Sequence, residues 1–211
     1  MTDGSQAAWA IVVARTGPTA KTRLRSVLSP AERARLALAM LADVLAACRA
    51  GPVAGSVAVV EGPAGQAVAE RYGAHCEPDP GRGMNAAVLA GLTAATRRGA
   101  TTAIVLPGDL PLASPADLRT LLEAVAERPR VVVVAPDRAG QGTNALLLRP
   151  PDVIRPSFGE GSCSRHLELA RAAGAGALCV PRPGLALDLD RPADLLDPRV
   201  QAYLGATAAW S

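Results

Sequence analysis

Aromatic side chains are nearly absent from this chain of 211 residues, which has two tryptophans, two tyrosines and one phenylalanine. Proteins that bind single-stranded nucleic acid stack the bases on such rings. The formal net charge of +3 arises from arginines that are scattered rather than gathered in a basic run, so the electrostatic footprint of a nucleic-acid-binding protein is also missing. A mild positive balance suits small anionic ligands instead.

Cysteine and histidine are scarce as well. The four cysteines and two histidines are Cys48, Cys76, Cys163, Cys179, His75 and His166. No two cysteines form a C-x-x-C pair, so the sequence argues against a zinc site and indicates no disulfide framework. We expect free thiols in a reducing compartment, and histidines with a structural or supporting role rather than a nucleophilic one.

Long apolar runs are missing too, since no stretch approaches the roughly 18 apolar residues of a membrane span. The first apolar run, residues 7–14, ends at Arg15 and is too short for the apolar core and cleavage site of a signal peptide. We therefore expect a cytoplasmic protein with no membrane partner.

Aliphatic side chains must build the core, because hydrophobic residues make up 49% of the sequence. Short β-prone runs alternate with segments of helical spacing, which is typical of an α/β protein. We predict a single domain over residues 1–211, ordered over about residues 8–200, folded as a Rossmann-like three-layer sandwich with a mainly parallel mixed sheet. The predicted strands are Ala8–Ala14, Ser56–Val60, Thr102–Leu106, Val131–Ala135, Ala145–Leu148, Leu178–Val180 and Leu185–Leu189.

Two of the predicted helices begin with a capping signature, Ser29-Pro-Ala-Glu32 and Ser114-Pro-Ala-Asp117. The first of these helices is predicted to end near Gly51 and the second near Arg128. Four further helices are predicted at Ala64–Tyr72, Asn85–Arg98, Ser162–Ala173 and Pro192–Leu196. The segment Glu77–Gly83 is expected to be irregular. The loop Pro136–Gly142 is expected to join two strands and to leave Thr143 and Asn144 exposed.

A basic loop follows the first strand, at the edge of the sheet where such folds bind ligands. Arg15, Lys21 and Arg23 lie in it together with threonines and a glycine, directly before a helix. Cationic side chains and backbone amides can hold a triphosphate. The spacing of a Walker A loop is absent, and an ordinary solvated basic loop is the alternative.

A single carboxylate, Asp109, interrupts apolar sequence after the predicted strand Thr102–Leu106. A charge placed there needs a partner, and a metal or an arginine are the candidates. The alternative is a loop aspartate that caps a turn. Gly108, beside it, permits close approach of another backbone or of a ligand.

Two further carboxylates, Asp188 and Asp190, are spaced i and i+2 in a segment predicted to be a strand. Side chains alternate along a strand, so both would project to the same side. Like charges so close repel unless a cation lies between them, and Mg²⁺ combines carboxylates with substrate phosphates. The alternative, that Asp190 only caps the helix starting at Pro192, leaves Asp188 unexplained.

A glycine-rich loop, Phe158–Gly161, leads into a helix at Ser162. Its backbone amides and the Ser162 hydroxyl could bind a phosphate, although a plain helix cap is equally compatible. Gly81-Arg-Gly-Met-Asn85 also opens a helix, but it is a weak match to a dinucleotide fingerprint.

In this order and spacing, the motifs resemble the guanylyltransferases that make a diphosphate-linked guanosine intermediate of the 5-deazaflavin coenzyme from 2-phospho-L-lactate or phosphoenolpyruvate. The resemblance covers residues 9 to about 196. It rests on AKTRL at 20–24, GMNAA at 83–87, LPGDLPL at 106–112, APDRAGQGTNALLL at 135–148, FGEGSCSRH at 158–166 and LALDLD at 185–190. Two departures are Val13-Ala-Arg15 in place of Pro-Val-Lys, and Gly108 in place of alanine.

The resemblance implies a nucleotidyltransferase fold with a seven-stranded mixed sheet, similar to nucleotide-sugar and molybdenum-cofactor transferases. It implies that GTP and a small phosphorylated carboxylic acid are the substrates, with Mg²⁺ as cofactor. The implied roles are Mg²⁺ binding by Asp109, Asp188 and Asp190, binding of the acid by Thr143, Gly159 and Ser162, nucleotide binding by Arg15, Lys21, Arg23, Gly83 and Asn85, and catalysis by the three aspartates with Lys21.

Other readings of the same sequence stay open. The acceptor could be a sugar phosphate or molybdopterin, although those relatives carry a more glycine-rich first loop. A non-catalytic nucleotide binder would be expected to have lost one of the three aspartates, and a nicotinamide-dependent dehydrogenase needs a G-x-G-x-x-G after the first strand. Phosphoenolpyruvate is the favoured acid over 2-phospho-L-lactate and phosphoglycerate, and both a monomer and a homodimer are compatible with the sequence.

Overall fold

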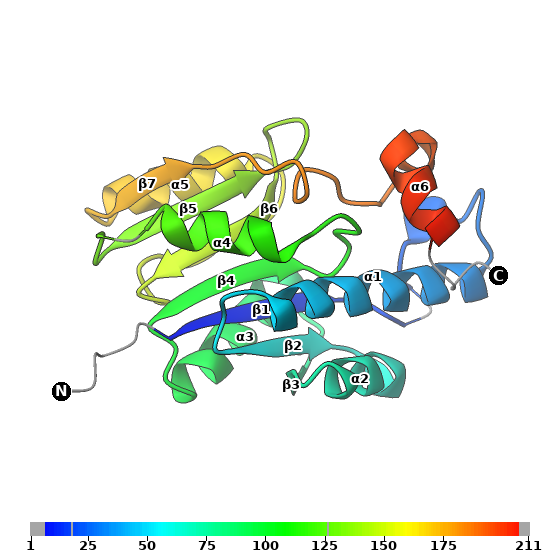
Figure 1. Cartoon of the computed structure of the whole chain (residues 1–211), viewed down its shortest axis with the longest axis horizontal. Helices are drawn as coiled ribbons and strands as arrows, with labels where there is room; N and C mark the ends of the chain where they lie inside the picture. Colours follow the sequence, from blue (N-terminus) through cyan, green and yellow to red (C-terminus); the bar gives the residue numbers. More distant parts are fainter. Residues whose placement is uncertain (1–6, 18, 126, 207–211) are drawn as a thin grey trace.

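The computed structural model describes residues 7–17, 19–125 and 127–206. Within these residues the chain forms a seven-stranded sheet with the order β3-β2-β1-β4-β6-β5-β7 (Figure 1). The strands are β1 Ala8–Ala14, β2 Gly55–Val60, β3 His75–Pro78, β4 Thr102–Pro107, β5 Val131–Pro136, β6 Thr143–Arg149 and β7 Gly176–Cys179. The helices are η1 Thr22–Leu24, α1 Pro30–Ala50, α2 Gly62–Arg71, α3 Met84–Arg97, α4 Pro115–Glu123, α5 Ser162–Ala172, η2 Pro192–Leu196 and α6 Pro198–Ala206.

The strand directions confirm the prediction of a mainly parallel mixed sheet. Strands β1, β2, β3 and β4 pair in parallel, and β5 pairs in parallel with β7. Strand β6 runs antiparallel between β4 and β5. Because β1 and β4 are parallel neighbours, the loops that follow them emerge side by side at one edge of the sheet.

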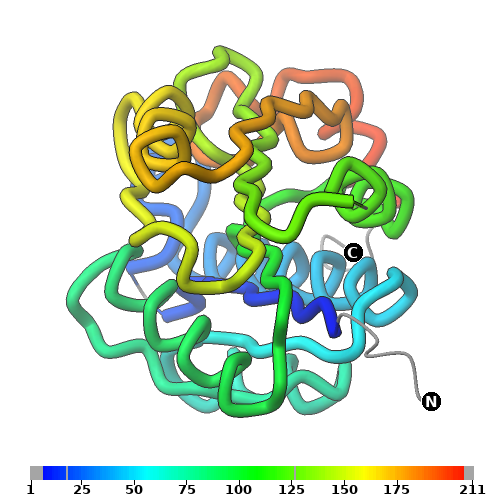
Figure 2. The backbone as a smooth tube through the Cα atoms, turned by 90° about the vertical axis from the view of Figure 1, so that its left-hand side faces the viewer, coloured from blue at the N-terminus to red at the C-terminus, as the bar shows by residue number. Residues whose placement is uncertain are grey.

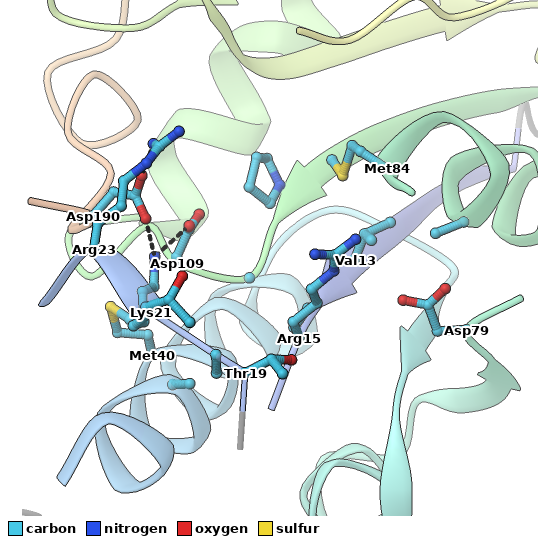
Figure 3. A pocket seen from close by; sticks show the side chains of 17 residues that line it. Val13, Arg15, Thr19, Lys21, Arg23, Met40, Asp79, Met84, Asp109 and Asp190 are labelled. Carbon is cyan, nitrogen blue, oxygen red and sulfur yellow. Dashed lines mark hydrogen bonds and ion pairs between the residues drawn. The ribbon is translucent and has the colours of Figure 1, made fainter. Parts of the chain in front are cut away.

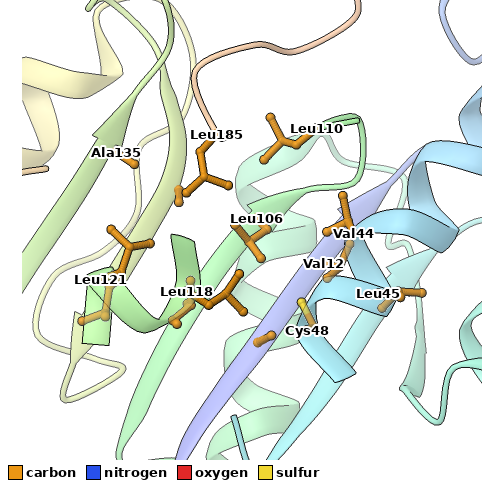
Figure 4. Packing of buried hydrophobic residues seen from close by; sticks show 14 of the residues in the cluster. Val12, Val44, Leu45, Cys48, Leu106, Leu110, Leu118, Leu121, Ala135 and Leu185 are labelled. Atoms are coloured by element: carbon orange, nitrogen blue, oxygen red, sulfur yellow. The ribbon is translucent and has the colours of Figure 1, made fainter. Parts of the chain in front are cut away.

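Helices cover both faces of the sheet (Figure 2). One apolar cluster joins the sheet to α1, α2 and α4, and includes Val12, Leu45 and Leu118 (Figure 4). The other joins the opposite face to α3 and α5, and includes Ile11 and Val88. Burying each such side chain contributes roughly 1.5–3 kcal/mol, so a core with few rings suffices for a stable three-layer fold.

Both capping signatures form as predicted. Ser29 accepts a hydrogen bond from the Glu32 amide while the Glu32 carboxylate accepts one from the Ser29 amide. Ser114 and Asp117 repeat the arrangement at α4. However, α4 ends at Glu123, earlier than the predicted end near Arg128. One reason is that the buried Arg149 guanidinium donates a hydrogen bond of 3.0 Å to the Val125 carbonyl.

The predictions at the sheet edges were partly wrong. The first residues of Glu77–Gly83 belong to β3, because an edge strand can end in a proline whose missing N–H is not needed for pairing. Strand β7 lies at Gly176–Cys179 rather than Leu178–Val180. Helix α6 was not predicted at all.

The predicted strand Leu185–Leu189 does not form: Leu185 ends a turn, Ala186 lies in a bend, and residues 187–189 have no regular structure. Its leucines are buried, as the alternation indicated. The Leu189 amide instead donates to the Asp109 carbonyl at 3.2 Å, and the Leu185 carbonyl accepts from the Asn144 side chain at 2.9 Å. The segment therefore crosses the ends of the strands and carries Asp188 and Asp190 to Asp109.

None of the helices in the described part of the chain is long and apolar enough to cross a membrane.

Candidate functional site

A pocket of about 420 Å³ lies at the carboxyl ends of β1 and β4 (Figure 3). The basic loop after β1 forms one wall, and the loop after β4 forms another. Close packing of the two strands depends on Gly108, since a Cβ atom there would lie 2.5 Å from the Ala14 Cβ. Five of the predicted site residues line this pocket: Arg15, Lys21, Arg23, Asp109 and Asp190.

The basic loop is held in shape by residues from two helical regions. Arg33 of α1, which is buried, donates to the carbonyls of Ala20 and Leu28. At the start of the loop, Glu61 accepts a hydrogen bond from the Gly17 amide at 2.8 Å. Lys21 has a φ of 52°, in the left-handed region that non-glycine residues rarely adopt. These contacts hold the loop on both sides of Lys21, and neither Arg33 nor Glu61 was predicted as a site residue.

Lys21 is the centre of a network of ion pairs (Figure 3). Its ammonium lies 2.6 Å from Asp109 Oδ2 and 3.7 Å from Asp190 Oδ1, and its side chain is only 8% exposed. Arg23, which is 65% exposed, also pairs with Asp190. The structure thus brings two predicted cations together with two predicted carboxylates.

Asp188 lies beside this network on its buried side. Burial, and then the nearby charge of Asp109, raise the pKa of the Asp188 carboxyl above its ordinary value. The Asn144 amide donates to Asp188 at 3.5 Å. Asn144 is buried, contrary to the expectation of exposure, because its side chain spans from β6 to the crossing segment.

A cation is the missing partner that the geometry of these carboxylates suggests. Among the described residues, Asp109 Oδ1 is a buried side-chain oxygen without a hydrogen-bond partner, and Asp188 interacts unfavourably with Asp109. Hard oxygen donors of this kind suit Mg²⁺. In this conformation, however, no group of three acidic, histidine or cysteine side chains in the described residues is arranged to hold a metal, and the Lys21 ammonium partly takes that place.

The residues predicted to bind the acid lie outside this pocket, around the start of β6 and of α5. Thr143 is buried, contrary to expectation, and its hydroxyl lies 3.0 Å from His166 Nδ1. Gly161 rather than Ser162 is the N-cap residue of α5, with a φ of 66°. Ser162 is the first helical residue, and its amide donates to the Gly159 carbonyl at 3.1 Å.

The two sides of the site are connected through neighbouring residues of β6. Thr143 faces His166, and Asn144, which follows it, contacts Asp188. Asp188 in turn interacts with Asp109. A ligand at Thr143 and a ligand in the pocket would therefore approach the carboxylates from different directions.

Gly83 and Asn85, predicted near the nucleotide, do not line the pocket. Gly83 caps α3 with a φ of 85°, while its neighbour Met84 is a lining residue. The Asn85 amide is engaged by Phe158, whose amide donates to Asn85 Oδ1 at 2.7 Å and whose carbonyl accepts from Asn85 Nδ2 at 3.1 Å. The Asn85 side chain thus connects the two loops.

Asp79 lines the pocket, although it was not among the predicted site residues. It lies across the pocket from the Lys21 network, with Arg15 between them (Figure 3). Its Oδ1 accepts from the Gly81 amide at 2.8 Å. An aspartate directly after an edge strand was the available signal, but it fell in a segment predicted only as irregular.

The two histidines have structural contacts, as expected. His75 stacks on Trp9 with ring centroids 5.7 Å apart. His166 is fully buried, and burial, followed by the charge of Arg165, lowers its pKa to about 4. His166 is therefore neutral at physiological pH.

The sequence is similar to known proteins over most of its length. The model of a protein family described as "Guanylyl transferase CofC like" matches residues 9–200. A protein of Conexibacter woesei named phosphoenolpyruvate guanylyltransferase is 43% identical over 189 residues, which cover 89% of this chain and 85% of that protein. A protein of Phenylobacterium zucineum named 3-phospho-D-glycerate guanylyltransferase is 41% identical over 195 residues, which cover 89% of this chain and 88% of that protein.

Solved structures support the fold class. A putative nucleotide-diphospho-sugar transferase from Desulfovibrio desulfuricans superposes with a TM-score of 0.75 at 17% identity, over 96% of this chain and 92% of that one. A nucleotidyl transferase from Methanothermobacter has a TM-score of 0.68 at 22% identity, over 96% of this chain and 100% of that one. The predicted nucleotidyltransferase fold is confirmed.

Proposed function

Because this chain belongs to the family of CofC-like guanylyl transferases, we propose that it transfers GMP from GTP to phosphoenolpyruvate and releases pyrophosphate, as a step of deazaflavin coenzyme biosynthesis. The observation that carries the proposal is the pocket in which Lys21 and Arg23 face Asp109 and Asp190. Cations that bind phosphates and carboxylates that bind a metal are needed together for nucleotidyl transfer. GTP and phosphoenolpyruvate are both cytoplasmic metabolites, so the proposed reaction is a cytoplasmic one.

The proposed nucleotide would place its phosphates at the cationic end of the pocket and its base at the other end. Lys21, Arg23 and Arg15 would contact the phosphates. Asp79, across the pocket, offers a carboxylate that can accept from the N1–H and N2–H₂ groups of guanine. Adenine has an acceptor at N1, so a carboxylate in that place favours GTP over ATP.

The acid would bind at Thr143, Gly159 and Ser162, and Asn144, which follows Thr143, contacts the Asp188 carboxylate. The relative from Conexibacter is named for phosphoenolpyruvate, which favours this acid over 2-phospho-L-lactate. The relative from Phenylobacterium is named for 3-phospho-D-glycerate, which makes that acid the second candidate.

The chemistry requires little of the protein beyond placement and charge. An oxygen of the acid's phosphate attacks the α-phosphorus of GTP in line, the new P–O bond forms, and pyrophosphate leaves with the electrons of the bond that breaks. The attacking oxygen is already anionic, so no side chain has to act as a base. Positioning of the two substrates and neutralisation of their charge supply the catalysis.

Asp109, Asp188 and Asp190 are the residues that would hold Mg²⁺, and the orphaned Asp109 oxygen fits that role. When bound, the ion would offset the negative charge of the two phosphorylated substrates. Lys21 would then exchange its contact with Asp109 for the pyrophosphate that leaves.

The experiment is a pyrophosphate-release assay with GTP and Mg²⁺, testing phosphoenolpyruvate, 2-phospho-L-lactate and 3-phosphoglycerate separately, with ATP in place of GTP as control. Release that requires GTP together with phosphoenolpyruvate is the expected result. Pyrophosphate release with 3-phosphoglycerate alone would make that acid the substrate and leave the proposed reaction unchanged. No release with any acid, from folded protein that binds GTP, would overturn the proposed reaction.

A further inference from the structure

The loop of residues 157–162, which carries two of the predicted acid-binding residues, is held by side chains from outside it. Asn85 of α3 makes two hydrogen bonds to the Phe158 backbone. His166 of α5 accepts a hydrogen bond from the Ser157 amide at 2.9 Å. The His166 ring also meets the Phe158 ring edge-on, with centroids 5.0 Å apart. Two consecutive backbone units before Gly159 are thereby fixed.

The contact with Ser157 determines which nitrogen of His166 carries the proton. A backbone N–H can only donate, so Nε2 must present its lone pair. The ring is neutral, because burial, and then the charge of Arg165, lower its pKa to about 4. A neutral imidazole has one N–H, which must therefore be on Nδ1.

The Nδ1–H group in turn fixes the role of the Thr143 hydroxyl. The two atoms are 3.0 Å apart, and Nδ1–H donates while Thr143 Oγ1 accepts. Among the described residues, that hydroxyl is hydrogen-bonded to His166. The Thr143 O–H is left to donate to a ligand, and the ligand atom it meets must be an acceptor. An oxygen of a phosphate or a carboxylate is an acceptor without a competing proton.

We propose that His166 is a positioning residue for the phosphorylated acid, acting through Thr143: it holds the Thr143 hydroxyl as a hydrogen-bond donor to an oxyanion while it anchors the loop that contains Gly159. This inference rests on the proposed function, because it assigns a supporting residue to the acid subsite. His166 does not touch the substrate, and it exchanges no proton in the reaction.

Two substitutions of His166 each keep one of the two hydrogen bonds of the ring and remove the other. In His166→Gln the amide oxygen reaches the place of Nε2 and can still accept from Ser157, but no donor remains for Thr143. In His166→Asn the amide nitrogen lies near the place of Nδ1 and can still donate to Thr143. Kinetics with the acid and GTP varied separately should show the KM for the acid raised on the order of tenfold in His166→Gln. The rise should be smaller in His166→Asn, and the KM for GTP should stay within about twofold in both.

A double-mutant cycle tests whether His166 acts through Thr143. Thr143→Val removes the hydroxyl with little change of shape, and should raise the acid KM by a similar factor. The double variant His166→Gln/Thr143→Val should be no worse than Thr143→Val alone. Additive effects, or an equal loss for GTP and the acid, would overturn the proposal. His75→Gln, at the other histidine, is the control and should leave both KM values unchanged.

Nitrogen-15 NMR of the wild-type protein gives a readout that needs no variant and no turnover. The His166 ring should show a protonated Nδ1 and a bare Nε2 at pH 7, and addition of phosphoenolpyruvate should shift the Nδ1–H signal. A protonated Nε2 would overturn the inference. If the wild type turns over no acid, the reaction is wrong, whereas turnover with an unchanged acid KM in His166→Gln makes the inference alone wrong.

Discussion

The two halves of the site are built on different physical principles. The side proposed to bind the nucleotide, at the ends of β1 and β4, is a network of charges in which Lys21 pairs with Asp109 and Asp190. The side proposed to bind the acid, at the starts of β6 and α5, is held by neutral hydrogen bonds of the buried Thr143 and His166. On the proposed function, the first side would have to exchange its internal ion pairs for ligands. The second side would keep its hydrogen bonds when a ligand binds.

This difference affects how much binding energy each side can gain from its ligand. A charged side chain that is paired in the free protein loses that partner when a phosphate or a cation replaces it, so part of the binding energy is offset. A buried neutral network loses nothing comparable. Substitutions on the nucleotide side should therefore change turnover and the response to GTP, whereas substitutions on the acid side should change the KM for the acid.

The largest expected effect is that of Asp188→Asn. The variant keeps the shape and removes the charge, so turnover should fall on the order of a thousandfold. Its thermal stability should be unchanged or higher, because Asp188 is destabilised by burial and by Asp109. Steady-state turnover and thermal unfolding check both halves of the prediction. Asp152→Asn, an exposed aspartate outside the site, is the control, and a folded Asp188→Asn protein with full activity would exclude the aspartate from metal binding.

The next effect is that of Lys21→Gln on the nucleotide side. Loss of a cation that faces the departing pyrophosphate should lower kcat/KM for GTP on the order of a hundredfold, while the KM for the acid stays the same. Arg25→Gln, which changes an exposed cation of the same loop, serves as the control. If the acid KM rose as much as the GTP KM, the two halves of the site would not be independent.

Much of the fold could be predicted because it is specified by local patterns. Apolar runs located the central strands, and the capping residues located the starts of α1 and α4. The four-residue edge strands β3 and β7 were harder, since their pairing depends on the neighbouring strand rather than on their own sequence. Leu185–Leu189 shows the same limit, because alternation predicted a strand where the chain has a turn, a bend and irregular structure.

Charged residues of the candidate site could be predicted from the sequence, whereas the residues that position them could not. Carboxylates and cations at strand ends are visible in a sequence, and five of them line one pocket. The residues that position them act across long separations, as Glu61 does 44 residues from Gly17. Arg33 left a signal, because it lies on the same face of α1 as the buried Leu36 and Met40, where an arginine needs specific partners.

A smaller effect is expected at the end of the pocket proposed to bind the base. Asp79→Asn removes an acceptor that suits guanine, so the preference for GTP over ATP should fall about tenfold, with little change in turnover at saturating GTP. Parallel assays with the two nucleotides measure the ratio. Glu77→Gln, at a nearby carboxylate of β3 that does not line the pocket, should keep the wild-type ratio. An unchanged ratio in Asp79→Asn would place base recognition elsewhere.

The last expected effect is on stability rather than on catalysis, and it concerns pH and the neutral side of the site. The pKa of His166 is about 4 in the folded protein, against an ordinary value of 6.5. Between these values the unfolded chain binds a proton that the folded protein does not, so stability is full above pH 6.5 and falls as the pH drops toward 4. The loss from this residue has an upper bound of about 3 kcal/mol. Urea unfolding at pH 7 and pH 4.5 should show a smaller acid-induced loss in His166→Gln than in the wild type, because all other titrating groups are shared. An equal acid-induced loss of stability in the two proteins would mean that His166 becomes charged without disturbing Ser157 and Thr143. The contrast between a charged half and a neutral half of the site would then hold only at neutral pH.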